Sequence, residues 1–327
     1  MSLADFQYLR PRTIDEAVGY LARHAGDLEI LAGGTDLIPS MKQRLFTPKY
    51  VMDIRSIAEM RGIREDFDST VIGALTTLTT IERSQQLRRD YPVLTEAAAA
   101  VASPILRNMG TIGGNICLDT RCLWYNQSLT WRQSCGFCIK KDGDLCHVAP
   151  GGTKCWAAFS ADTPPALLCL GASIEIAGPK GLRRVALKNF YTNEGDARMK
   201  LEKNELVTRV FLPRSAAGHR GAYRKLRVRG SIDYPLAGVA VTFRTHNGHI
   251  DEAQVAITAV NPAPFLVADA HTLLDGHHLD ESLAVIAGDA AANVSRPLTT
   301  SALTPEYRRE MVKVLTKRAL LSLGSPH

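Results

Sequence analysis

The chain has 327 residues, of which 45% are hydrophobic and 22% charged, and its formal net charge is +6. This length predicts two or three domains, and the composition is typical of a globular protein and excludes a disordered one. No stretch reaches the roughly 18 apolar residues of a membrane span, and the N-terminus lacks a signal-peptide pattern, so we expect a cytoplasmic protein without membrane contact. The basic residues are scattered, with no helix-turn-helix or aromatic RNA-binding pattern, and we expect no nucleic-acid partner.

The N-terminal part of the chain, residues 1–57, predicts a small βαβ-like subdomain. Thr13 and Glu16 fit a capping box at the start of an amphipathic helix. The apolar strand 28–31 then enters a loop with two adjacent glycines, and residues 50–54 have the pattern of the next strand.

Residues 58–215 predict a second subdomain. The expected elements are a strand at 70–74, helices at 79–89 and 93–102, and strands at 173–177 and 206–213. Between them, residues 118–158 hold many cysteines and glycines and show little periodicity. We therefore expect a long irregular insert there, and irregular segments of this length are usually functional.

The remaining residues, 216–327, predict a C-terminal α+β domain. The expected strands are 221–226, 238–244 and 254–260, and the expected helices are about 266–274, 280–292 and 305–320. Asn247-Gly248 lies between the last two strands and is typical of a tight hairpin turn. The whole chain therefore belongs to the α+β class.

Two glycine loops carry the first functional signal, Ala32-Gly-Gly-Thr-Asp36 and Gly110-Thr-Ile-Gly-Gly-Asn115. Adjacent glycines let a backbone approach a ligand closely, and their N–H groups can form a nest for an anion such as a pyrophosphate. Neither loop is a Rossmann or Walker A motif. Each could also be an ordinary tight turn, but the pair favours a dinucleotide site.

These loops resemble a known family. Leu31-Ala-Gly-Gly-Thr-Asp-Leu37 and Arg107-Asn-Met-Gly-Thr-Ile-Gly-Gly-Asn-Ile116 are similar to the FAD-binding loops of the medium subunits of molybdenum hydroxylases, which include carbon monoxide dehydrogenase and xanthine dehydrogenase. Ser160-Ala-Asp-Thr-Pro-Pro-Ala-Leu-Leu168 resembles the next block of that family. The resemblance implies a vanillyl-alcohol-oxidase-type FAD fold of two subdomains and a C-terminal domain.

The resemblance also implies a set of residues that bind FAD without a covalent bond. The first loop would cradle the pyrophosphate, the second loop would form another cradle, Asp162 would bond the cofactor, Leu206 would pack on it and Lys225 would lie near the isoalloxazine. The full set is Leu31, Ala32, Gly33, Gly34, Thr35, Asp36, Leu37, Thr111, Ile112, Gly113, Gly114, Asn115, Asp162, Leu206 and Lys225. Since such a subunit relays electrons, we expect no catalytic acid–base pair or nucleophile.

The insert holds five of the seven cysteines, Cys122, Cys135, Cys138, Cys146 and Cys155. Without an export signal a metal site is favoured over disulfides, and soft thiolates favour zinc or an iron–sulfur cluster. Cys135 and Cys138 form a C-x-x-C without a matching second pair, which fits a zinc ribbon poorly and leaves a redox dithiol open. Trp124, Trp131, Trp156 and Phe137 could shield a cluster or simply fill the insert, and we expect His147 to be a loop residue.

The insert resembles that of the flavin subunits of 4-hydroxybenzoyl-CoA reductases, which carry an additional 4Fe-4S cluster. Their ligand pattern matches Cys122, Cys138, Cys146 and Cys155, with Cys135 as the alternate that spacing alone would prefer. The resemblance implies a molybdopterin-binding large subunit, a small subunit with two 2Fe-2S clusters, and ferredoxin as electron donor. The rival interpretations are a flavin subunit that passes electrons from molybdenum to NAD or a quinone, and a non-enzymatic scaffold with a zinc-stapled insert.

Overall fold

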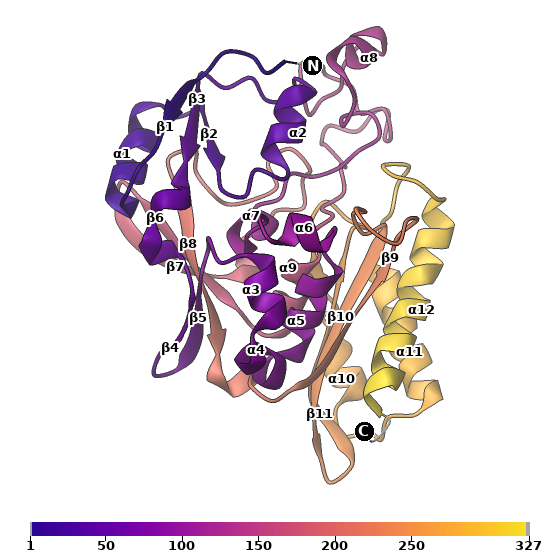
Figure 1. Cartoon of the computed structure of the whole chain (residues 1–327). Helices are drawn as coiled ribbons and strands as arrows, with labels where there is room; N and C mark the ends of the chain where they lie inside the picture. The colour runs from indigo at the N-terminus through magenta and orange to yellow at the C-terminus, as the bar shows by residue number, and fades with distance from the viewer. Residues whose placement is uncertain (1, 325–327) are drawn as a thin grey trace.

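The computed structural model describes residues 2–324 and contains three β-sheets with helices between and beside them (Figure 1). The first sheet is formed within residues 7–53, the second within 63–213 and the third within 220–266. These groupings follow the order of the three expected units, whose boundaries stay a prediction. None of the described helices is long and apolar enough to cross a membrane.

The first sheet is parallel, with the order β1 (Gln7–Leu9), β3 (Tyr50–Asp53) and β2 (Leu28–Leu31). Helix α1 (Ile14–Arg23) connects β1 to β2, and α2 (Leu37–Lys42) follows the first glycine loop. Thr13 caps α1 as the sequence predicts, because its hydroxyl accepts the Glu16 N–H. The Glu16 carboxylate accepts the N–H of Arg12 rather than that of Thr13.

The second sheet is antiparallel and has the strand order β4-β5-β8-β6-β7. Its strands are β4 (Ile63–Glu65), β5 (Ser69–Gly73), β6 (Ser173–Gly178), β7 (Gly181–Ala186) and β8 (Leu206–Pro213). The long return between β5 and β6 contains most of the helices that lie in the middle of Figure 1. It also contains the cysteine-rich insert, which lies between helices α7 and α9 and interrupts no strand of the sheet.

The helical layer consists of short helices: α3 (Leu78–Arg83), α4 (Gln85–Asp90), α5 (Pro92–Ala100), α6 (Pro104–Arg107), α7 (Ile112–Ile116) and α9 (Thr163–Cys169). The prediction of a single helix over 79–89 is wrong, because one helix ends before Ser84 and another begins after it. The Ser84 hydroxyl accepts the Leu87 N–H and caps a second helix, which is the usual role of serine at a helix start.

The third sheet is antiparallel with the order β12-β11-β10-β9. Its strands are β9 (Arg220–Leu226), β10 (Ala237–His246), β11 (His249–Thr258) and β12 (Phe265–Leu266), and its helices are α10 (Ala270–Leu274), α11 (Glu281–Val294) and α12 (Pro305–Gly324). Asn247 and Gly248 form the expected hairpin turn, with φ angles of 52° and 82°. The helix expected over 266–274 begins later, since Phe265 and Leu266 pair with β11.

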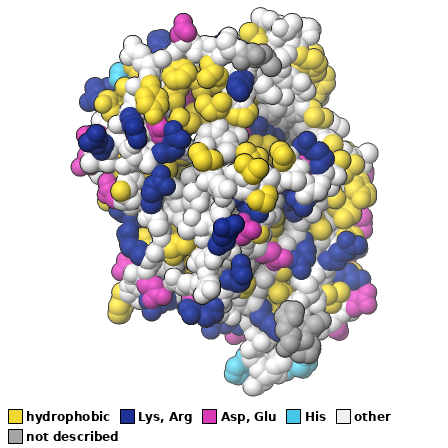
Figure 2. All heavy atoms as spheres, in the orientation of Figure 1, with side chains coloured by type: hydrophobic (Ala, Val, Ile, Leu, Met, Phe, Trp, Pro, Cys, Tyr) yellow, Lys and Arg dark blue, Asp and Glu magenta, His cyan; other side chains and the backbone are white. Residues whose placement is uncertain are grey.

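One continuous hydrophobic core joins the three sheets. It extends from Leu21 and Met52 of the first unit, through the second sheet and helical layer, to Tyr223 and Ala240 of the third. On the face that Figure 2 displays, basic and acidic side chains are interspersed among apolar ones.

The two ends of the insert lie side by side where they meet the helical layer. Arg121 and Ala158 exchange backbone hydrogen bonds of 2.7 and 2.8 Å, which close its base. Apart from α8 (Leu129–Ser134) it is irregular, as expected, and it lies at the top of Figure 1 beside α2. The Leu123 N–H donates to Thr300 O, so the insert also contacts the C-terminal domain.

Asp53 holds the end of β3 in place. Its carboxylate accepts hydrogen bonds from the Tyr8 hydroxyl at 2.5 Å and from the Arg55 guanidinium at 2.6 and 2.9 Å. Burial disfavours the ionised carboxyl, but the hydrogen bonds from Arg55 and Tyr8 outweigh this and lower the pKa of Asp53 to about 2. The ionised form therefore stabilises the fold.

We predict that Asp53→Asn lowers the free energy of unfolding at pH 7 by about 2 kcal/mol. The contribution of Asp53 is fully present above its unfolded-state pKa of about 4 and is lost as pH falls toward about 2. Urea unfolding should therefore show a smaller difference in the free energy of unfolding between wild type and variant at pH 3 than at pH 7. A difference of the same size at both pH values would contradict the assignment.

Candidate functional site

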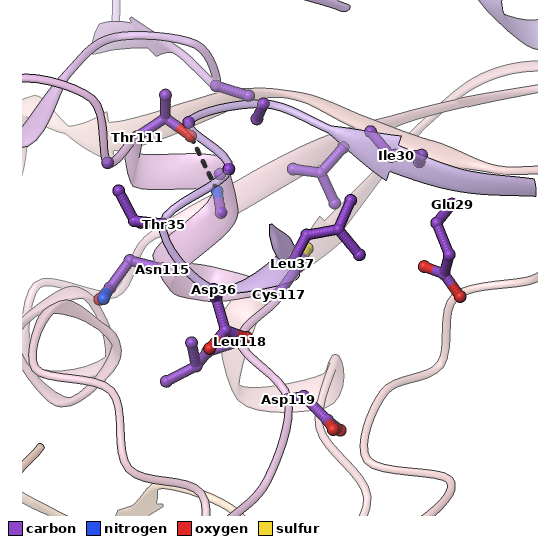
Figure 3. Close-up of a pocket in the computed structure, with 18 of the residues that line it drawn as sticks. Glu29, Ile30, Thr35, Asp36, Leu37, Thr111, Asn115, Cys117, Leu118 and Asp119 are labelled. Atoms are coloured by element: carbon purple, nitrogen blue, oxygen red, sulfur yellow. Dashed lines mark hydrogen bonds between the residues drawn. The ribbon is translucent and has the colours of Figure 1, made fainter. Parts of the chain in front are cut away.

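A cavity of about 690 Å³ lies where the first sheet, the helical layer and the third unit meet (Figure 3). The first glycine loop lies along one wall, and Thr111, Asn115 and the segment after α7 lie along another. Twelve of the fifteen predicted flavin residues line it: Ala32, Gly33, Gly34, Thr35, Asp36, Leu37, Thr111, Gly113, Gly114, Asn115, Asp162 and Leu206. Leu31, Ile112 and Lys225 are not among its lining residues.

The first glycine loop lies against the second at Gly33, and close backbone contacts explain two of the glycines. A Cβ atom on Gly33 would lie 2.1 Å from the carbonyl oxygen of Met109, and one on Gly113 would lie 2.8 Å from the Cβ of Ala74. Both positions therefore exclude a side chain because of the neighbouring chain, whatever occupies the cavity. Gly34 needs glycine for another reason, since its φ is +72°.

The loops differ in the donors that they leave free. In the second loop, the N–H groups of Ile112 and Gly113 donate to Thr76 O and Ala74 O, and the Gly114 N–H donates to the Thr111 hydroxyl at 3.1 Å (Figure 3). In the first loop, the N–H groups of residues 33–36 donate to no other described residue. Successive free N–H groups are what a pyrophosphate requires, so the first loop fits that group.

Asp162 lines the cavity, and Lys225 lies behind it. The Lys225 ammonium is 3.0 Å from the Asp162 carboxylate and also donates to Ala100 O and Asp233 O. The Tyr223 hydroxyl donates to Asp162 Oδ1 at 2.8 Å. Burial raises the pKa of Asp162, and Lys225 opposes that effect. Lys225 is therefore joined to the cavity through Asp162 and Asp233, which both line it.

Several charged residues line the cavity that the sequence analysis missed. Glu29 comes from β2, where a charge inside an apolar strand was an available signal, and burial raises its pKa. Asp119 and Arg198 come from separate loops and lie 3.3 Å apart. Burial opposes the charged form of Asp119, but Lys140 and Arg198 outweigh it and lower its pKa. No local pattern marks that pair.

Three units of the chain meet at the cavity edge in one polar contact. The Tyr234 hydroxyl, from the β9–β10 loop, donates to Asp36 Oδ1 at 3.0 Å. Arg121, from the base of the insert, donates to the same hydroxyl at 2.7 Å, contacts Asp36 and lies 4.3 Å from the centre of the Tyr234 ring. The insert is thereby joined to the cavity rim.

A second, small cavity of about 20 Å³ lies inside the insert. Its lining includes Cys122, Cys138, Cys146 and Cys155, all buried and all free thiols, whereas Cys135 lies outside it. Within residues 2–324, no three His, Cys, Asp or Glu side chains are close enough to hold a single metal ion. The four thiols surround a space instead of converging on one point.

Burial raises the pKa of the Cys122 and Cys155 thiols to about 11. A metal or cluster would therefore have to displace protons from them. Trp124 and Trp156 line the cavity, while Trp131 is 37% exposed and Phe137 does not line it. His147 lines it too, but stacks on Trp124 at 4.3 Å and bonds Phe137 O, as a loop histidine would.

The comparisons with known proteins identify the family. A family model described as "FAD binding domain in molybdopterin dehydrogenase" matches residues 4–215, and "CO dehydrogenase flavoprotein C-terminal domain" matches residues 221–323. The chain belongs to the FAD-binding medium subunits of the molybdenum hydroxylases. It is an oxidoreductase subunit with an FAD-binding domain, and the α+β fold expected from the resemblance is confirmed.

Relatives match the chain along nearly its full length. The carbon monoxide dehydrogenase medium chain of Afipia carboxidovorans is 33% identical over 96% of this chain and 95% of its own. The nicotine 6-hydroxylase medium subunit of Paenarthrobacter nicotinovorans is 26% identical over 99% of both. A crystal structure of Cu,Mo-CO dehydrogenase superimposes with a TM-score of 0.82 at 32% identity and 99% coverage of both chains.

We predict that Gly33→Ala and Gly113→Ala lose FAD. The new Cβ atom on Gly33 meets Met109 beside the second loop, and the one on Gly113 meets Ala74, so each substitution displaces a loop that lines the cavity. Overpacking of this kind costs about 1–3 kcal/mol or more. The flavin-to-protein ratio after gel filtration measures the loss. Gly230→Ala is the matched control, since a Cβ there meets nothing within 4 Å. Full flavin in Gly33→Ala would refute the argument from loop contact.

Proposed function

We propose that the chain is the FAD and 4Fe-4S subunit of a 4-hydroxybenzoyl-CoA reductase. One observation carries the proposal: four cysteines, drawn from positions up to 33 residues apart in the insert, surround one buried cavity beside the flavin domain. The comparisons support the FAD-binding domain. The proposal of a cluster and of this substrate depends on the insert and on its resemblance to the flavin subunits of 4-hydroxybenzoyl-CoA reductases.

The donor set of the insert suits a cluster. Four thiolates are the ligands of a 4Fe-4S cluster and also of tetrahedral zinc, and the four thiols line one buried cavity. The resemblance of the insert supports the cluster over zinc. Cys122, Cys138, Cys146 and Cys155 are the ligands that we propose, and Cys135 is excluded because it lies outside the cavity.

The proposed reaction removes a phenolic hydroxyl. 4-Hydroxybenzoyl-CoA, two electrons and two protons give benzoyl-CoA and water, and two molecules of reduced ferredoxin each lose one electron. We propose that this occurs in a complex with a molybdopterin-binding large subunit, which binds substrate, and a small subunit with two 2Fe-2S clusters. When bound, FAD and the cluster would supply electron transfer, and the chain's own residues bind and orient them.

In this proposal the first glycine loop holds the pyrophosphate of FAD with its free N–H groups. Thr111 and Asn115 contribute side chains from the second loop, and Leu206 packs on the cofactor. Asp162, held by Lys225 and Tyr223, would contribute a carboxylate to the cofactor from the start of α9. Phe46 lines the flavin cavity and packs against the core of the insert, which includes three of the four proposed ligands.

A second function is favoured by the relatives. The carbon monoxide dehydrogenase and xanthine dehydrogenase chains among them support a subunit that carries electrons away from molybdenum, to NAD or a quinone. The two functions differ in direction of electron flow. Turnover of 4-hydroxybenzoyl-CoA by the purified complex with reduced ferredoxin supports the reductase, whereas turnover of a reduced substrate with NAD or a quinone alone supports the alternative.

We predict that anaerobically purified protein contains four iron and four acid-labile sulfide per chain beyond its partners' clusters. Replacement of Cys122, Cys138, Cys146 or Cys155 by serine should remove the cluster and leave FAD bound, because the glycine loops lie outside the insert. Electron paramagnetic resonance of the reduced proteins measures this. Cys135→Ser is the matched control and should retain the signal. Zinc in place of iron, or an intact signal in Cys146→Ser, would contradict the ligand assignment.

We also predict that the chain works only in a hetero-oligomer. Affinity purification from cells that express all subunits should return a large and a small partner in equal amounts. The isolated chain should bind FAD and reduce artificial dyes at most, because in this proposal the phenol binds to the molybdopterin-binding large subunit. Full reductase activity from this chain alone would refute the prediction.

A further inference from the structure

Lys140 is a buried cation beside the proposed cluster. Its side chain is only 4% exposed, and it lines the cavity that the four cysteines surround. Taking an ammonium group out of water is expensive, so a buried lysine needs strong partners to stay charged. The proposed function gives this residue no role.

The partners of Lys140 fix its position. The ammonium donates to Asp119 Oδ1 at 2.8 Å, to the Thr120 hydroxyl at 2.5 Å and to the Gly195 carbonyl at 2.8 Å. These bonds use all three of its donors, and the ring of Tyr125 lies 4.7 Å away. A lysine with every donor occupied and a buried stem is a charge at a defined place.

The chain of charges continues from the cluster cavity to the flavin cavity. Lys140 lines the first cavity, whereas Asp119 and Arg198 line the second. Arg198 lies 3.3 Å from Asp119 and donates to the carbonyls of Leu118 and Cys117. Figure 3 shows Cys117, Leu118 and Asp119 on one segment, which follows α7 and borders the pocket. The ammonium also lies close to one proposed ligand, because it donates to Gly195 O and the Gly195 N–H donates to Cys155 O at 2.9 Å.

We propose that Lys140 is a positioning residue that raises the reduction potential of the cluster, while Asp119 offsets part of its effect. This rests on the proposed 4Fe-4S site. When the cluster takes one electron from the donor, its charge becomes more negative by one, and a nearby fixed cation stabilises that state. Local charge and burial are among the factors that set such potentials. A potential raised in this way favours uptake of the electron from ferredoxin.

A purely structural role for Lys140 would give different results. If the lysine only held the insert to the flavin domain, removal of either partner would loosen the insert in the same way. If it acts as a charge, the two partners must act in opposite directions. Lys140→Met should lower the cluster potential, and Asp119→Asn should raise it. In Asp119→Asn the ammonium keeps the Thr120 and Gly195 acceptors, and in Lys140→Met the carboxylate keeps Arg198.

The test is a redox titration of the whole purified complex under anaerobic conditions, with the reduced-cluster signal followed by electron paramagnetic resonance. At a fixed potential, Lys140→Met should reduce the ratio of reduced to oxidised cluster about tenfold, as expected for loss of one partly screened charge. For a one-electron couple this is about 59 mV. Asp119→Asn should shift the ratio the other way by a smaller factor.

Lys141→Met is the matched control. Lys141 is adjacent, 37% exposed, and 3.5 Å from Asp142, so its charge is largely screened by water and should not move the potential. Iron, sulfide and flavin contents are measured for each variant. If Lys140→Met fails to assemble, Lys140→Gln and Asp119→Asn carry the test.

The outcomes separate this inference from the proposed function. A wild-type complex without the cluster signal overturns both. A wild-type cluster whose potential is unchanged in Lys140→Met, or shifts in the same direction in Lys140→Met and Asp119→Asn, overturns the inference alone. Opposite shifts with an unchanged Lys141→Met control support it.

Discussion

The structure depends on a close approach between two stretches of backbone. Gly33 lies against Met109 with no room for a side chain, and Gly113 lies against Ala74 in the same way. The first contact brings a loop of the first sheet onto the helical layer, the second holds α7 against the end of β5, and the large cavity lies beside both. A steric constraint within the protein therefore explains the glycines better than contact with a phosphate does, although the free N–H groups of the first loop still suit one.

The insert is a separate small core attached to this frame. Its cysteines pack with Leu45, Tyr125 and Ala157, and partly buried Phe46 extends the contact to the flavin cavity. Hydrogen bonds between Arg121 and Ala158 close its base, and Lys140 joins it to Gly195, which lies outside the insert. The insert thus has its own hydrophobic core, and a few hydrogen bonds hold it to the rest of the chain. Such an element can bind one cofactor without disturbing the binding site of another.

Local signals in the sequence predicted much of this architecture. The capping residue Thr13 and the Asn247-Gly248 turn depend on short-range chemistry that is visible in a few residues. The glycine loops were visible as motifs, but the contacts that require Gly33 and Gly113 involve residues far away in the sequence. The Ser84 break was also local but was concealed by a continuous helical pattern. The chain Lys140–Asp119–Arg198 could not be predicted, because its members pair across loops and none stands in a motif. Lys225 was expected at the flavin, yet its bonds to Asp162, Ala100 and Asp233 depend on how three units pack together.

The contact among Asp36, Arg121 and Tyr234 has a consequence for the order of assembly. Each residue belongs to a different part of the chain, and Asp36 and Tyr234 also line the large cavity. No single unit forms the cavity, so a ligand can occupy it fully only after all three have docked. Such a ligand binds the assembled state alone and shifts the equilibrium toward it by mass action. The dinucleotide therefore binds after the three units have docked, and its concentration sets the fraction of chains in which they are docked.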